Sequence, residues 1–189
     1  MAARMPGVAD REVYTGRVVT LRLRDFRGAD GQTRRREIVE HAPGAAVLAV
    51  DEHGHVLLVR QYRAAVDAWL LELPAGIVDP GEEPVACARR ELEEETGYTV
   101  ERLEPLARFY PSPGFCTELL HVFLGLGLRV CTVAADDEED LELVRLPLRK
   151  ALELVRRGEI IDAKTVVGLL AYRDLTEYRS VARPSVGPA

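Results

Sequence analysis

The segment at residues 76–98, GIVDPGEEPVACARRELEEETGY, places a dense set of carboxylates beside apolar residues at helical spacing. Pro84 suits the first turn of a helix, and Gly97 suits the position just past its end. The sequence therefore predicts a loop at residues 76–81 and a helix at residues 84–96.

The predicted helix has an apolar side with two carboxylates at its margin. Val85, Ala88 and Leu92 fall on one side, at the spacing of a packed helix. Glu91 and Glu95 lie four residues apart at the edge of that side, where two like charges repel each other. Hard oxygen ligands suit Mg²⁺ or Mn²⁺, and Mg²⁺ usually takes one or two carboxylates plus waters and substrate phosphates. The pattern indicates a divalent-cation site, and a solvated acidic helix face is the alternative.

Composition excludes several other classes of protein. The 189 residues suffice for one domain with a core. A net charge of -6 without a basic block argues against nucleic-acid and membrane-surface binding. The three cysteines form no CxxC pair, which argues against a disulfide framework and a zinc site. No apolar run approaches the ~20 residues of a membrane span, so we expect a cytoplasmic protein.

Strands are predicted to outnumber helices outside the acidic segment. The first ten residues read as a loose terminus, and the turn sequence GADG predicts a hairpin between the first two strands. Further helices are predicted at 147–157, closed by Gly158, and at 163–178, with Asp162 as N-cap. Because strands do not alternate regularly with helices, the expected class is α+β. The predicted strands are residues 12–25, 34–40, 45–50, 55–61, 69–73, 103–109, 119–126 and 141–146.

The acidic segment resembles the Nudix hydrolase signature, GX5EX7REUXEEXGU, in which U is an aliphatic or aromatic residue. The resemblance implies a Nudix-type α/β/α sandwich of mixed sheets, with the signature as a loop-helix-loop. It also implies that bound cations activate water against a diphosphate. Every fixed position of the signature is filled, by Gly76, Glu82, Arg90, Glu91, Leu92, Glu94, Glu95, Gly97 and Tyr98.

The resemblance also implies roles for individual residues of the signature. Glu91 and Glu95 would be metal ligands, Glu94 a further ligand or water contact, and Glu82 a peripheral ligand. Ala75 would bind the cation through its carbonyl oxygen, and Arg90 would orient the glutamates by ion pairing. The expected cofactor is Mg²⁺, for which Mn²⁺ or another divalent cation can substitute.

Sequence outside the signature resembles the ADP-ribose pyrophosphatase branch of the family. PSPGFCTE places Pro113 sixteen residues after Gly97, and VRQYR, WLLELPAG and REIVEH extend the similarity. By that resemblance Arg36 and Arg63 would contact phosphates or the terminal ribose, for which an Arg fork is suited. A surface ion pair is the alternative for each arginine. Glu72 would help to hold the nucleotide, and the ribose pocket would be shaped by Pro113, Gly114, Phe115 and Glu118.

Two expectations concern the acidic loop and the N-terminal strands. In the resembling branch a loop glutamate positions or deprotonates the attacking water, and Glu138 or Glu139 would take that role. Relatives often stack aromatic side chains on adenine, whereas this chain has Val18 and Val19 at that place. The N-terminal hairpin resembles the element that such proteins exchange in homodimers. We expect a dimer-forming β element at 1–40, a catalytic domain at 41–180 and a loose tail at 181–189.

The resemblance implies an Mg²⁺-dependent hydrolase that cuts ADP-ribose, a small-molecule substrate, to AMP and ribose 5-phosphate. Two alternatives remain open. One is a broader pyrophosphatase for ADP-sugars or GDP-mannose, because the valines weaken the expectation of strict adenine recognition. The other is a regulator that binds ADP-ribose without cutting it.

Overall fold

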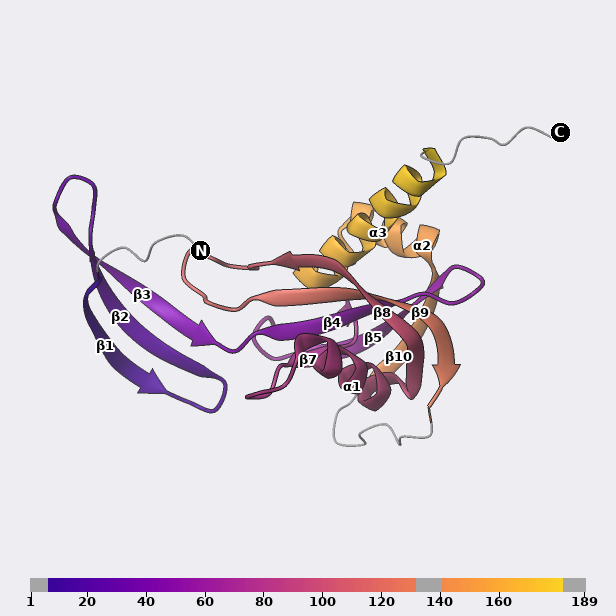
Figure 1. Cartoon of the computed structure of the whole chain (residues 1–189), viewed down its shortest axis with the longest axis horizontal. Coiled ribbons are helices and arrows are strands. Elements are labelled where there is room, and N and C mark those ends of the chain that lie inside the picture. Colours follow the sequence, from indigo (N-terminus) through magenta and orange to yellow (C-terminus); the bar gives the residue numbers. More distant parts are fainter. Residues whose placement is uncertain (1–6, 132–140, 182–189) are drawn as a thin grey trace.

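The structure is a computed structural model that describes residues 7–131 and 141–181. Thirteen elements follow one another along these residues, and Figure 1 shows their arrangement. They are β1 (Gly7–Thr15), β2 (Val19–Arg27), β3 (Thr33–His41), β4 (Gly44–Ala49), β5 (His55–Arg63), β6 (Ala68–Glu72), β7 (Ala75–Ile77), α1 (Pro84–Thr96), β8 (Tyr98–Phe109), β9 (Leu120–Val130), β10 (Glu142–Pro147), α2 (Leu148–Arg157) and α3 (Ala163–Val181).

The N-terminal part forms a three-stranded antiparallel sheet in the order β1-β2-β3, rather than a two-stranded hairpin. The single strand predicted at 12–25 is wrong, because the chain turns between Thr15 and Val19, where Gly16 N–H donates to the Val19 carbonyl at 2.9 Å. The loose terminus is also shorter than expected, since β1 begins at Gly7. Alternating residues on both sides of the turn conceal it in the sequence. The hairpin predicted at GADG is confirmed between β2 and β3.

The body of the molecule is built on two sheets, one with the order β7-β4-β9-β8 and one with the order β10-β5-β6. Strand β4 is buried on both faces and runs parallel to β9. Ala45, Val47 and Ala49 pack with α1, whereas Ala46 and Leu48 pack in the core that includes α2 and α3. Because successive strand residues point to opposite faces, one strand supplies both cores. The α/β/α sandwich predicted for this α+β chain is confirmed.

Helix α1 begins and ends where the sequence predicts. Pro84 occupies its first turn, and Gly97 adopts the left-handed conformation with φ 68° after its last residue. Ala88 and Leu92 are fully buried, but Val85 is 43% exposed, so its predicted burial is wrong. Val85 instead faces a groove that it lines together with residues of β8 and β9, and Cys87 completes the buried face of the helix.

The other boundaries differ from the prediction by small amounts. Strand β8 begins at Tyr98, directly after α1, and not at Leu103. The short strand β7 overlaps the start of the predicted loop at 76–81, and it pairs with β4. At the start of α3, Asp162 accepts a hydrogen bond from Thr165 N–H at 3.0 Å, which confirms its role as N-cap.

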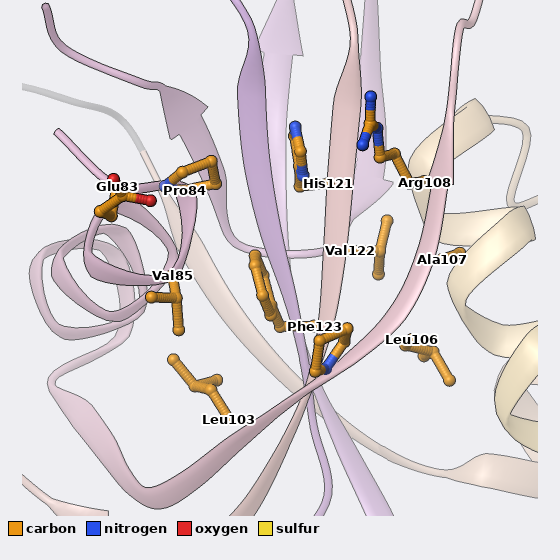
Figure 2. A pocket seen from close by; sticks show the side chains of 11 residues that line it. Glu83, Pro84, Val85, Leu103, Leu106, Ala107, Arg108, His121, Val122 and Phe123 are labelled. Atoms are coloured by element: carbon orange, nitrogen blue, oxygen red, sulfur yellow. The ribbon is translucent and has the colours of Figure 1, made fainter. Parts of the chain in front are cut away.

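A groove with a volume of 690 Å³ separates the start of α1 from β8 and β9. Figure 2 shows Val85, Leu103 and Phe123 turned toward this space, with His121 and Arg108 further along it. The exposure of Val85 places an apolar side chain at this surface.

No helix within residues 7–131 and 141–181 combines the length and the apolar composition that crossing a membrane requires.

The contrast between Leu92 and Val85 gives a test of how α1 is packed. Leu92→Ala should lower the free energy of unfolding by about 2–5 kcal/mol, because a buried side chain leaves a cavity. Val85→Ala is the comparison on the same helix and should lower it by less, because 43% of Val85 is exposed within one chain. Urea denaturation measures both. Equal losses would contradict the burial of this helix face.

Candidate active site

Three of the four glutamates of the signature gather around one guanidinium group. Arg90 Nε and Nη2 donate to the two carboxylate oxygens of Glu82, each at 3.1 Å. Its Nη1 donates to Glu91 at 2.6 Å and to Glu94 at 3.1 Å. The hydrogen bonds to Glu82, followed by the charges of the other carboxylates, raise the pKa of Arg90, although burial opposes this. The hydrogen bond from Arg90 in turn lowers the pKa of Glu82. One guanidinium thus donates hydrogen bonds to three carboxylates.

Two carboxylates of α1 press against the backbone of β7. Glu95 Oε2 accepts a hydrogen bond from Ala75 N–H at 3.1 Å. The Glu91 carboxylate lies directly over the Cα of Gly76, where a Cβ would overlap its oxygens. Any other residue at this position would displace the Glu91 carboxylate. These two carboxylates are therefore part of the contact between the helix and the strand.

The donor set at this meeting point fits a hard divalent cation. Glu91 and Glu95 provide carboxylate oxygens beside the β7 backbone, and Ala75 provides a carbonyl oxygen on that strand. Within the described part of the chain, no three His, Cys, Asp or Glu side chains form a ready-made metal cage. Mg²⁺ does not need such a cage, since it retains waters and takes only one or two carboxylates. The residues fit Mg²⁺ or Mn²⁺ better than a metal that prefers nitrogen or sulfur.

A pocket of 490 Å³ opens beside this meeting point. Ala75 and Gly76 form part of its wall, so the carboxylate pair and the pocket share one strand. Three more of the residues singled out from the sequence also line it, namely Arg63, Glu72 and Glu118. The pocket is large enough for a small-molecule ligand.

Arg63 and Glu72 form a fork across the β5–β6 pair. Arg63 Nε and Nη2 donate to the two oxygens of Glu72 at 2.8 and 2.7 Å. Glu72 also accepts a hydrogen bond from Lys164, and the residue is only 1% exposed. Burial alone would raise the pKa of Glu72, but the contacts with Arg63 and Lys164 outweigh it and lower the pKa. Glu72 thus remains ionised although it is buried.

The remaining candidates lie at or beyond the edge of the pocket. Pro113, Gly114 and Phe115 belong to the loop before β9, but of this loop only Pro111 and Glu118 line the pocket. Phe115 is 55% exposed, and its carbonyl accepts a hydrogen bond from Val39 N–H on β3 at 2.7 Å. The loop thus joins the N-terminal sheet to the body.

Arg36 lies in the N-terminal sheet and does not line the pocket of its own chain. Its guanidinium stands 5.4 Å from the centre of the Phe26 ring and donates to the Arg35 carbonyl. Glu138 and Glu139 lie outside the described residues.

Two charged residues of the pocket were not singled out as site residues from the sequence. Asp162 and Lys164 line the pocket from the start of α3. The sequence did contain a signal for Lys164, because it is one of only two lysines in the chain and lies two residues after the predicted N-cap Asp162. The spacing between Glu72 and Lys164 in the sequence gave no indication that they meet.

Comparison with known proteins agrees with this geometry. The model of the NUDIX domain matches residues 40–166. The ADP-ribose pyrophosphatase of Bacillus subtilis is 40% identical over 164 residues, covering 86% of this chain and 89% of that protein. The GDP-mannose pyrophosphatase of Cronobacter sakazakii is 39% identical over 155 residues, covering 76% and 81% of the two chains.

A solved structure described as an ADP compounds hydrolase has the same fold. It superposes with a TM-score of 0.81 and 23% identity, over 92% of this chain and 94% of that one. The signature on α1, the sandwich around it and these matches lead to one conclusion: the chain belongs to the Nudix family.

Proposed function

We propose that this protein is a divalent-cation-dependent pyrophosphatase that hydrolyses ADP-ribose to AMP and ribose 5-phosphate. The observation that carries the proposal is the contact of Glu91 and Glu95 with Gly76 and Ala75, at the wall of a pocket that also contains Arg63. A cation site and a phosphate-binding arginine thus face one small cavity. Two relatives named ADP-ribose pyrophosphatase support the substrate, one from Bacillus subtilis and one from Mycobacterium tuberculosis at 34% identity.

In this proposal Mg²⁺ is held by Glu91, Glu95 and the Ala75 carbonyl, with Glu94 as a further ligand or water contact. When bound, the cation would neutralise the charge of the phosphates and lower the pKa of the water that it binds. Arg90 keeps the carboxylates in place through its hydrogen bonds.

The substrate is positioned by the pocket. Arg63 contacts the diphosphate, and Glu72 acts by holding Arg63, since both of its oxygens already accept hydrogen bonds. Glu118 shapes the ribose end from the pocket wall, and Pro113, Gly114 and Phe115 act by forming the loop that carries it. Water attacks the adenosine-side phosphorus, the bridging P–O bond breaks, and ribose 5-phosphate leaves. Glu138 or Glu139 takes the proton of that water.

A broader specificity for nucleotide sugars is the second candidate. Val18 lines the pocket, and no Phe, Tyr or Trp is among the pocket residues that the structure describes. The described pocket wall of one chain therefore offers no aromatic ring on which a base could stack. Relatives named GDP-mannose pyrophosphatase, at 39% to 40% identity, favour the same alternative.

We also propose that the protein is a homodimer in the cytoplasm. Its three free cysteines suit a reducing compartment. The N-terminal sheet stands beside the body in Figure 1. The hydrogen bonds that link this sheet to the body include those from Val39 N–H and His41 N–H to the loop before β9. A small sheet is stable only when another layer covers one of its faces. On β1, the exposed fractions of Val13 and Tyr14 are 51% and 59%. The apolar groove of Figure 2 offers such a layer on a second copy, and Arg36 would then serve the neighbouring pocket.

The substrate proposal is tested by hydrolysis of a panel that contains ADP-ribose, other ADP-sugars, GDP-mannose, NADH and diadenosine polyphosphates, each with Mg²⁺. We expect the highest kcat/KM for ADP-ribose, with AMP and ribose 5-phosphate as products by chromatography. A clear preference for GDP-mannose would establish the second candidate instead. Binding of ADP-ribose without hydrolysis would support the regulator.

The dimer proposal predicts that the purified protein sediments as a dimer in analytical ultracentrifugation. Val13→Asp should weaken the dimer by about tenfold or more in Kd, because it places a charge in an apolar contact. Val130→Asp is the matched control, since Val130 is 77% exposed at the end of β9 and outside the groove. A monomeric parent protein, or equal effects of the two changes, would refute this interface.

A further inference from the structure

Four charged side chains meet at one wall of the pocket. Arg63 and Glu72 come from the β5–β6 pair, whereas Asp162 and Lys164 come from the start of α3, and all four line the cavity. Lys164 Nζ donates to Glu72 Oε2 and, at 3.1 Å, to Asp162 Oδ1. The side chain of Lys164 is only 8% exposed. A buried ammonium group of this kind is rare unless it is paired.

The Arg63–Glu72 fork by itself carries no net charge. Both oxygens of Glu72 accept hydrogen bonds from Arg63, so this carboxylate neutralises the guanidinium most directly. A diphosphate that approached the isolated pair would meet a carboxylate behind its arginine, and the attraction would be small. The Arg63 side chain is nevertheless 40% exposed and lines the pocket.

Lys164 supplies the missing positive charge. Its other partner, Asp162, is already stabilised by the start of α3, where Thr165 donates to it from N–H at 3.0 Å and from Oγ1 at 2.6 Å. A helix N-terminus carries a partial positive charge, so Asp162 does not depend on Lys164 alone. The charge of Lys164 is therefore available to Glu72.

We propose that Lys164 is a positioning residue that neutralises Glu72. The positive charge of Arg63 is then not cancelled by Glu72, and Arg63 stays oriented for the diphosphate. The inference rests on the proposed function, because that function assigns Arg63 to the diphosphate. Lys164 acts through Glu72 and not as a direct phosphate ligand, since its Nζ is already held by two carboxylates and its side chain is nearly inaccessible.

The first test is Lys164→Met, which keeps the length of the side chain and removes its charge. We expect the Kd for inorganic pyrophosphate, measured by calorimetry with Mg²⁺, and the KM for ADP-ribose each to rise about tenfold, with kcat within about threefold. Lys164→Arg should restore both to within about threefold of the parent. Lys150→Met is the matched control, because Lys150 is the only other lysine and forms an exposed ion pair with Glu153.

The second test distinguishes neutralisation of Glu72 from direct contact with phosphate. In a Glu72→Gln background there is no buried carboxylate to neutralise, so adding Lys164→Met should change the Kd for pyrophosphate by less than about twofold. This double variant leaves no buried unpaired charge, so it remains informative if Lys164→Met alone does not fold.

Several results would overturn the inference. They are a pyrophosphate Kd for Lys164→Met equal to that of the parent, a loss confined to kcat, failure of Lys164→Arg to restore binding, or an undiminished loss in the Glu72→Gln background. Pyrophosphate binding does not require turnover. If the parent protein cleaved no nucleotide sugar, the proposed function would fail, whereas the pyrophosphate measurements would still decide the role of Lys164.

Discussion

The contact between the α1 carboxylates and the backbone of β7 is the constraint on which the rest of the site depends. Glu91 lies over Gly76, and Glu95 accepts a hydrogen bond from Ala75 N–H, so negative charge is held at one point of the fold. Arg90 offsets part of that charge through its hydrogen bonds with the other glutamates. A single guanidinium does not balance four carboxylates. The site is therefore suited to a cation that arrives with the substrate.

The scaffold fixes this contact from two sides. On one side, the buried face of α1 packs on β4 and sets the height of the helix over the sheet. On the other side, Thr165 at the start of α3 accepts a hydrogen bond from Leu73 N–H at 2.8 Å, two residues before Ala75. The segment between β6 and β7 is thus held by a helix from each layer of the sandwich. The hydrogen bonds from Leu73 N–H and Ala75 N–H position the backbone that carries the Ala75 carbonyl.

Much of this arrangement could be predicted from the sequence because it depends on local patterns. Pro84 and Gly97 mark the ends of α1, and the spacing of the glutamates places them on one helix. The turn at Gly16 was missed because the alternation of polar and apolar residues continues on both sides of it. The exposure of Val85 was missed because helical periodicity does not show where a groove separates the helix from the sheet. The pairing of Lys164 with Glu72 joins residues that are distant in sequence, and no local pattern encodes such a contact.

The measurement that tests the central claim most directly is a titration of the protein with Mn²⁺ followed by electron paramagnetic resonance. The account predicts that the parent protein binds Mn²⁺ and that Glu95→Gln and Gly76→Ala each weaken binding by about tenfold or more, since one removes a ligand and the other displaces Glu91. Glu83→Gln, at the exposed start of the same helix and without a capping hydrogen bond, should bind as the parent does. Equal Mn²⁺ affinity in all four proteins would contradict the account.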